Sequence, residues 1–260
     1  MSSDGYRRYV AIGDSQTEGL WDGDDDLGVV GFADRLAATI DSTHPGLMYA
    51  NLAIRGKRTA EVIAEQLEPA LLMRPDLISV CVGMNDALRP GRAFDQAMVD
   101  LRYLYARLAE SGATVMTTTF PDLTRMLPVG RLLTTRLRRV NGEIRAAADR
   151  HGLRLVDLHA AESMSDPATW SPDWLHASTH GHTLFAAAAA EALELPGASH
   201  DWATAPTVRA GNAPRVVRIR AQLQWTRHML LPWIIRHARG RSSGDGRAPK
   251  RPQLEGLAHA

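Results

Sequence analysis

Short apolar runs alternate with longer amphipathic stretches along about the first 195 residues of the 260-residue chain. Five runs predict buried strands, at residues 9–12, 48–52, 77–82, 114–118 and 153–156. Apolar residues at helical spacing predict helices at residues 32–40, 59–72, 94–109, 131–149 and 184–193. Strands that alternate with helices predict an α/β fold. We expect a doubly wound, three-layer sandwich with a five-stranded parallel sheet, of the flavodoxin-like type.

The pattern changes near the end of the last of these helices. Pro196 and Gly197 end it, and a second helix is predicted at 215–239, with arginines around an apolar stripe and Pro232 as a kink or an early end. The remainder is rich in Gly, Ser, Pro and Arg, a composition typical of disorder. We therefore divide the chain into a globular domain, an extension with a basic amphipathic helix, and a disordered tail, at residues 1–198, 199–239 and 240–260.

Charge is distributed unevenly, although the formal net charge is only +1. Residues 209–260 hold ten Arg and one Lys against Asp245 and Glu255, a balance of +9, which leaves about −8 for residues 1–208. The basic helix, with Trp225 and Trp233, suits an anionic membrane surface. The alternative, which we favour, is a helix that packs its apolar stripe on the domain. Charge also allows nucleic-acid binding, but no motif that reads nucleic acids accompanies it.

Two further features bear on location. No apolar run approaches the roughly 20 residues that a membrane-spanning helix needs. The amino terminus leads directly into the first strand, so Arg7 and Arg8 are not expected to belong to an export signal. We expect a cytoplasmic chain, with peripheral contact at the inner membrane surface if the basic helix binds lipid. The single cysteine, Cys81, lies in an apolar run and is expected to be buried and unreactive.

A serine follows the first strand in the sequence Gly13-Asp14-Ser15. A serine at the carboxyl end of a strand, opening into a helix, is placed as a nucleophile, and backbone N–H groups at the turn can face a developing oxyanion. The alternative is a helix cap with ordinary turn residues. Ser15 alone does not decide between them.

An Asp-x-x-His pair, Asp173 and His176, lies just ahead of the last helix of the domain. Asp173 would accept a hydrogen bond from one ring nitrogen and fix the tautomer, while the other nitrogen takes the proton of Ser15. A lone Asp-x-x-His is more often part of an ordinary surface loop. His180 and His182 follow closely, but no carboxylate cluster accompanies them, so we expect no metal site.

Hydrogen-bond donors follow the second and third strands. Gly56 offers a backbone N–H without a Cβ in the way, and Asn85 offers a side-chain amide. Each also has a structural interpretation, Gly56 as a loop residue and Asn85-Asp86 as a turn or helix cap. We expect these donors to lie at the same edge of the sheet as Ser15.

Taken together and in this order, Gly13-Asp14-Ser15, the Gly56 loop, Gly83-Met84-Asn85-Asp86 and the Asp173/His176 pair resemble the four blocks of the SGNH hydrolases, or GDSL family. The resemblance covers about residues 8–195. It implies that Ser15 is the nucleophile, His176 the general base and Asp173 its orienting group. It also implies an oxyanion hole of the Ser15 N–H, Gly56 and Asn85, with no metal or cofactor. Gln16 departs from the family's frequent leucine, and His180 stands where a small residue is common.

The resemblance implies an ester hydrolase but does not choose its substrate. The family accepts short-chain esters, acetylated sugars, lysophospholipids and thioesters. We expect a serine esterase for short acyl groups, with Asp14, Trp21 and Asp86 at the substrate site and residues 20–28 and 120–127 beside it. An acyltransferase, a lysophospholipase or thioesterase, and a non-catalytic membrane-associated binding protein of the same fold are the alternatives. The oligomeric state is not predicted.

Overall fold

The continuous apolar runs of the sequence become the strands of one sheet. The computed structural model describes residues 5–26, 28–89, 91–122, 130–204 and 243–257. Within these residues the strand order is β7-β6-β5-β1-β4-β8. The strands are β1 (Arg8–Gly13), β4 (Met48–Asn51), β5 (Leu77–Cys81), β6 (Thr114–Thr118), β7 (Arg154–Val156) and β8 (Arg251–Gly256), with a small separate pair of β2 (Gly23–Asp24) and β3 (Gly28–Val29).

The five expected strands all run parallel, and the central ones are buried on both faces. In β1 the residues from Tyr9 to Ile12 are 0% exposed, and every residue of β5 is buried. Strands covered on both faces read as continuous apolar runs rather than as alternating patterns. The fold is therefore the expected three-layer α/β sandwich.

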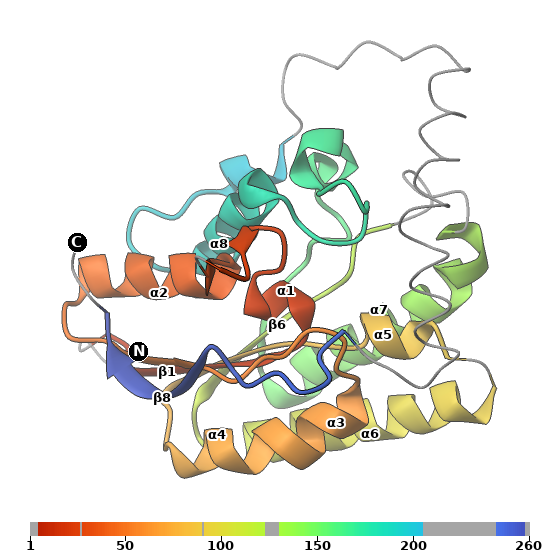
Figure 1. Cartoon of the computed structure of the whole chain (residues 1–260), viewed down its shortest axis with the longest axis horizontal. Helices are drawn as coiled ribbons and strands as arrows, with labels where there is room; N and C mark the ends of the chain where they lie inside the picture. Colours follow the sequence, from red (N-terminus) through yellow and green to blue (C-terminus); the bar gives the residue numbers. More distant parts are fainter. Residues whose placement is uncertain (1–4, 27, 90, 123–129, 205–242, 258–260) are drawn as a thin grey trace.

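Helices cover both faces of the sheet (Figure 1). Helices α2 and α8 pack against each other on one face, and α6 packs against α3 and α7 on the other. The helices are α1 (Ser15–Glu18), α2 (Phe32–Thr43), α3 (Thr59–Val62), α4 (Glu68–Leu72), α5 (Met84–Ala87), α6 (Arg92–Ala109), α7 (Gly130–His151) and α8 (Thr179–Ala192). A π-helical turn, η1 (Ile63–Leu67), joins α3 to α4, and short 3₁₀ turns lie at η3 (Glu162–Ser165), η4 (Pro167–Thr169) and η5 (His200–Ala203).

The end of the chain differs from the expectation of a disordered tail over 240–260. Residues 251–256 form β8, an antiparallel sixth strand that pairs with β4 at the edge of the sheet. The Arg251 guanidinium lies 5.4 Å from the ring centroid of Tyr49, so a cation–π contact supports the pairing. Charged, polar strands are typical of sheet edges, which explains why hydropathy did not reveal this one.

The predicted basic helix at 215–239 falls within residues 205–242, outside the described residues, and its contact with a membrane stays a prediction. Across the ranges that the structure describes, no helix combines the length and the hydropathy needed to cross a bilayer.

The topology reverses at β1. The chain leaves β1 for β4 on one side and later returns to β5 on the other. Loops that follow neighbouring parallel strands diverge at such a switch point, which leaves a crevice beyond their carboxyl ends. The loops after β1, β4 and β5 carry Ser15, Gly56 and Asn85, so the fold brings the three candidate segments to one rim.

Candidate active site

The turn after β1 is fixed from two sides. Gly13 has φ +141°, and a Cβ on it would lie 2.2 Å from the Cys81 carbonyl oxygen, so only glycine fits. The buried Gln66 amide, from the π-helical turn η1, accepts from Gly13 N at 2.8 Å and donates to Gly13 O at 2.9 Å. Ser15 then begins α1, with the Asp14 carboxylate accepting from Gln16 N at 3.3 Å. This turn fixes the direction of the serine side chain.

Ser15, His176 and Asp173 form one hydrogen-bonded row. The Ser15 Oγ lies 2.8 Å from His176 Nε2, and His176 Nδ1 lies 2.6 Å from Asp173 Oδ2. A carboxylate partner assigns the proton to Nδ1, which leaves Nε2 as the acceptor for the serine hydroxyl. Two segments 161 residues apart in the sequence therefore meet in the arrangement that a nucleophile and its base require.

The Asp173 carboxylate accepts hydrogen bonds from a neighbouring side chain and from the backbone. Its Oδ1 accepts from Ser171 Oγ at 2.7 Å and from the backbone N–H groups of Leu175 and His176, both at 2.9 Å. Burial alone would raise the pKa of Asp173, but the hydrogen bond and charge of the His176 ring, with the backbone N–H groups of His176 and Leu175, hold that pKa well below its usual value. Asp173 therefore stays an anion and can stabilise a protonated imidazole.

Trp21 contacts Asp173, a member of the triad that Ser15, His176 and Asp173 form. Its Nε1 donates to Asp173 Oδ2 at 2.7 Å, across 152 positions of sequence. The residue has φ +74°, a left-handed conformation that is unfavourable for a bulky side chain. The residue is nevertheless 40% exposed, so part of it remains open to solvent. The sequence suggested substrate contact for Trp21 but gave no signal for this bond.

The two candidate oxyanion loops are tied together by Asn85. Gly56 has φ +79° in a turn closed by Lys57 N donating to Ile54 O at 3.4 Å, a conformation that favours glycine. Asn85 Nδ2 donates to Lys57 O at 2.9 Å and to Asp14 Oδ2 at 3.2 Å. The side chain thus links the loop after β5 to the loop after β4 and to the turn after β1.

Asp14 and Asp86, which we expected at the substrate site, have partners within the protein. Both are buried, at 1% and 4% exposure. Asp86 Oδ2 accepts from Thr59 N at 3.0 Å and from Thr59 Oγ1 at 2.8 Å, so it anchors the start of α3. Burial raises the pKa of Asp14 to about 7. Both carboxyl groups therefore bond to neighbouring loops, and their contact with a substrate stays a prediction.

Gln16, noted in the sequence only as a departure from the family pattern, joins the serine turn to the histidine loop. Its Nε2 donates to Leu175 O at 2.9 Å, and Ala177 N donates to its Oε1 at 3.3 Å. These partners flank His176 on both sides. A leucine there could make neither bond, so the amide gives this chain its own means of holding the imidazole over Ser15.

His182 is fully buried and links α8 to the loop that carries Trp21. Phe32 N donates to its Nδ1 at 3.2 Å, and its Nε2 lies 3.3 Å from Leu20 O. Burial lowers the pKa of His182 from 6.5 to about 4, so the ring is neutral at pH 7. In the described parts of the chain no group of three or more His, Cys, Asp and Glu is arranged to hold a metal ion.

The depressed pKa of His182 predicts a pH-dependent contribution to stability. Because the unfolded chain binds this proton more readily, the contribution is complete above pH 6.5 and is lost as the pH falls towards about 4. Urea unfolding should therefore show that the stability difference between wild type and His182→Asn shrinks over that range. Comparing the two proteins at each pH cancels the contributions of other titrating groups. Asp14 is one of them, and its raised pKa has the opposite effect on stability. A difference that stays constant with pH would contradict the assignment of a neutral, buried ring.

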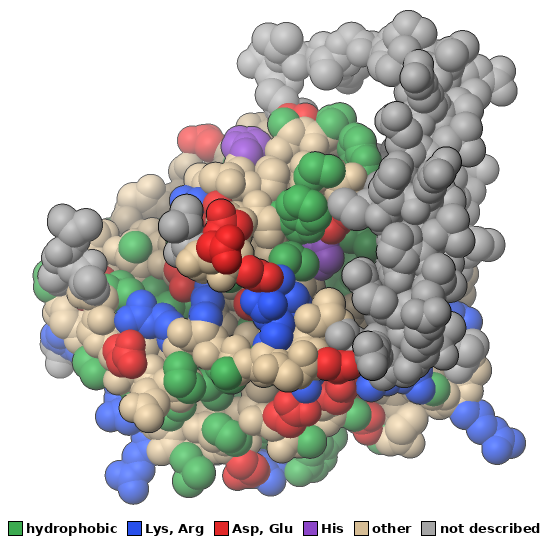
Figure 2. Space-filling view, in the orientation of Figure 1, with side chains coloured by type: hydrophobic (Ala, Val, Ile, Leu, Met, Phe, Trp, Pro, Cys, Tyr) green, Lys and Arg blue, Asp and Glu red, His purple; other side chains and the backbone are tan. Residues whose placement is uncertain are grey.

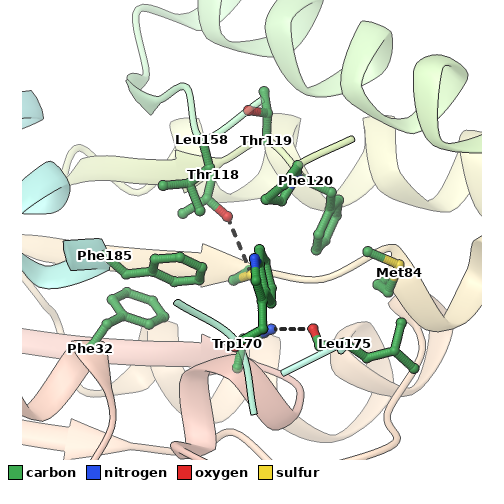
Figure 3. Close-up of a pocket in the computed structure, with 12 residues that line it drawn as sticks. Phe32, Met84, Thr118, Thr119, Phe120, Leu158, Trp170, Leu175 and Phe185 are labelled. Atoms are coloured by element: carbon green, nitrogen blue, oxygen red, sulfur yellow. Dashed lines mark hydrogen bonds between the residues drawn. The ribbon is translucent and has the colours of Figure 1, made fainter. Parts of the chain in front are cut away.

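A narrow apolar cavity is lined by side chains from several loops and helices, among them sequence neighbours of the candidate catalytic residues (Figure 3). Three of its lining residues, Gln16, Met84 and Leu175, directly neighbour Ser15, Asn85 and His176 in the sequence. The side chains leave room for about one water molecule. The full lining is Gln16, Phe32, Cys81, Met84, Thr118, Thr119, Phe120, Pro121, Leu158, Trp170, Leu175 and Phe185. Phe120 and Pro121 belong to the segment 120–127 expected beside the site, whose residues 123–127 lie outside those described.

Comparison with known proteins agrees with this geometry. A profile of the GDSL-like lipase/acylhydrolase family matches residues 11–184, a range that contains every group described above as a candidate for catalysis. No curated protein matches the chain.

Solved structures with the same fold include an acetylxylan esterase from Geobacillus stearothermophilus. It is 20% identical, with a TM-score of 0.60 over 80% of this chain and 100% of that one. An alpha/beta hydrolase enzyme from the metagenome of Lake Arreo, Spain, is 22% identical, with a TM-score of 0.59 over 72% of this chain and 95% of that one. Three further structures of the Geobacillus esterase are catalytic mutants, in which a serine, an aspartate or a histidine is replaced by alanine.

Proposed function

Since this chain belongs to the GDSL-like lipase/acylhydrolase family, we propose that it is a serine esterase that hydrolyses short acyl esters through an acyl-serine intermediate. The observation that carries the proposal is the row from Ser15 Oγ through His176 to Asp173, at 2.8 and 2.6 Å. A buried anion, an imidazole with a fixed tautomer and a hydroxyl in hydrogen-bond contact are the parts that nucleophilic acyl transfer needs.

In the first step Ser15 Oγ attacks the ester carbonyl carbon while His176 Nε2 takes the hydroxyl proton. The tetrahedral intermediate collapses, and His176 returns the proton to the departing alcohol. In the second step a water molecule attacks the acyl-serine, His176 takes its proton and passes it to Ser15 as the acid leaves. Asp173 remains an anion throughout and stabilises the imidazolium that forms twice in each cycle.

The carbonyl oxygen becomes negatively charged in both steps. We assign its donors as the backbone N–H groups of Ser15 and Gly56 and the side-chain amide of Asn85. Asn85 Nδ2 donates to Lys57 O at 2.9 Å and to Asp14 at 3.2 Å, so this role requires the side chain to rotate and give up the longer bond when the oxyanion forms. Burial raises the pKa of Asp14 to about 7, so near neutral pH a part of the molecules carries a neutral carboxyl group there, which competes less strongly for the Asn85 N–H. One such donor is typically worth about 10²–10³ in kcat.

The narrow cavity supports a short acyl group as the substrate. Its lining includes four aromatic rings and lies next to the proposed nucleophile and oxyanion donors, so the acyl chain is the part of an ester that suits it. Space for about one water molecule corresponds to an acetyl methyl group. The fold shared with an acetylxylan esterase is in keeping with an acetyl ester.

A chain-length panel tests this assignment. Phe120→Ala widens the cavity, so the ratio of kcat/KM for p-nitrophenyl butyrate to that for the acetate should rise about tenfold over wild type. The tenfold factor is expected because the butyryl chain has two more methylene groups than the acetyl group, and burying each contributes about 0.8 kcal/mol. Phe94→Ala, which removes a buried ring outside the cavity, should leave the ratio unchanged. The same ratio in all three proteins would exclude this cavity as the acyl site.

A further inference from the structure

The chain returns to the active-site face at its carboxyl end, far from the residues that make the triad. We call residues 243–250 the carboxy-terminal clamp. It leads into β8, which lies along β4 at the edge of the sheet (Figure 1). The clamp lies outside residues 11–184, to which the family profile is matched, so the family pattern gives it no role.

The clamp contacts the peptide bond that precedes Gly56. Gly244 is buried, and a Cβ on it would lie 2.2 Å from the Arg55 carbonyl oxygen and 2.8 Å from Ile54 Cγ2. The Arg55 carbonyl and the Gly56 N–H belong to one planar peptide unit and point in opposite directions. Packing against the carbonyl therefore sets the direction of the N–H on its other side.

Arg247 of the clamp also joins a network of ion pairs that includes Arg55, the residue before Gly56. Glu18, at the end of α1, accepts from Arg55 N at 2.5 Å and from Arg55 Nε at 2.9 Å, and both side chains are only 8% exposed. Arg247 reaches Glu18 at 3.7 Å and Asp25 at 2.6 Å, and Asp25 in turn pairs with Arg55 at 2.9 Å. Figure 2 shows acidic and basic side chains in contact on this face.

Lys250 fixes the other end of the clamp. Its Nζ donates to the backbone carbonyls of Glu18 at 2.5 Å and Val29 at 3.1 Å, and to Asp34 Oδ2 at 2.5 Å. Glu18 is thus bound by Arg55, Arg247 and Lys250, and it lies one turn of helix after Ser15. Both the helix that begins with the nucleophile and the loop that carries Gly56 are held by the clamp.

We propose that the carboxy-terminal clamp is a positioning element of the active site, which holds the Arg55–Gly56 peptide and α1 so that the Gly56 N–H faces the reacting carbonyl. The proposal rests on the proposed esterase function and adds residues beyond the matched family range to it. The backbone bond from Lys57 N to Ile54 O in this turn is long, at 3.4 Å, so side-chain contacts such as that of Glu18 with Arg55 N, and packing by Gly244, set its geometry. Gly244 and Arg247 are positioning residues, since each acts through the Gly56 loop rather than on the substrate.

The test compares two pairs of variants of the full chain with p-nitrophenyl acetate, after titrating competent sites with a fluorophosphonate. Gly244→Ala should lower kcat per titrated site about 10- to 100-fold with KM changed less than about twofold, because a displaced oxyanion donor acts in the transition state. Gly256→Ala is the matched control, since a Cβ there meets nothing within 4 Å. Arg247→Ala should lower kcat about three- to tenfold, and Arg247→Lys should restore part of it, because lysine keeps the charge near Glu18 and Asp25.

Each outcome supports or overturns the positioning role. If kcat per titrated site stays within twofold of wild type in Gly244→Ala and Arg247→Ala, the clamp only stabilises the fold and the proposal is wrong. If Gly244→Ala does not fold, the two Arg247 variants test the proposal, and kcat per titrated site within twofold of wild type in Arg247→Ala would overturn it. A wild-type protein that neither reacts with the fluorophosphonate nor hydrolyses the ester would instead overturn the esterase function itself.

Discussion

Ser15→Ala should lower kcat for p-nitrophenyl acetate by at least about 10⁴-fold while the protein stays folded. The loss is large because the substitution removes the atom that bonds to the acyl group, and what remains is the rate supported by the oxyanion donors and binding alone. The change costs the fold little, since one hydroxyl with a single 2.8 Å bond to His176 is removed. Steady-state kinetics and thermal unfolding of the purified variant measure the two effects.

Ser42→Ala is the matched control for that experiment. Ser42 lies in α2, and its hydroxyl donates to Thr39 O at 2.8 Å on the exposed surface. Its removal should leave kcat unchanged. A Ser15→Ala protein that keeps more than about a tenth of wild-type kcat would show that another group attacks the ester.

Asp173→Asn should lower kcat about 10³- to 10⁴-fold at neutral pH, with a smaller effect on KM. An asparagine amide can present its NH₂ group to His176, which favours the tautomer with the proton on Nε2 and removes the acceptor for the Ser15 proton. The substitution also weakens the bonds from Ser171, Trp21 and the two backbone N–H groups to this side chain. Some loss of stability should therefore accompany the loss of rate.

The measurement is kcat per fluorophosphonate-titrated site, together with the unfolding temperature of each protein. Asp95→Asn serves as the comparison, because Asp95 is 60% exposed and pairs with Arg139 on the surface. That variant should match wild type in both quantities. Near wild-type kcat in Asp173→Asn would mean that His176 needs no anionic partner, which contradicts the triad.

The sequence predicted the sheet because buried strands leave a strong local signal, whereas the triad followed from four ordered motifs that resemble a family together although each is ambiguous alone. Buried parallel strands appear as continuous apolar runs, and Ser15, Gly56 and Asn85 lie within a few residues of the ends of such runs. Asp173 and His176 lie just before α8. The expected contact between Ser15 and His176 corresponds to the observed 2.8 Å distance. Their catalytic roles, like those of Gly56 and Asn85, remain proposals that the variants above address.

The missed features are those that depend on distant contacts. The strand β8 is stabilised by its contacts with β4, while its own residues are polar and charged, so hydropathy favoured a disordered tail. Trp21 reaches Asp173 from a loop in a left-handed conformation, which no local pattern predicts. Asp86 stands next to Asn85 in the family motif, yet the structure uses it to anchor Thr59. In each case the partner lies far away in the sequence.

The central claim is that the hydroxyl of Ser15 attacks the ester, and peptide mapping of the fluorophosphonate adduct tests it most directly. We predict one label per chain, on the peptide that contains Ser15, with esterase activity falling in proportion to labelling. A label on any other residue, or activity that persists after Ser15 is fully labelled, would contradict this mechanism.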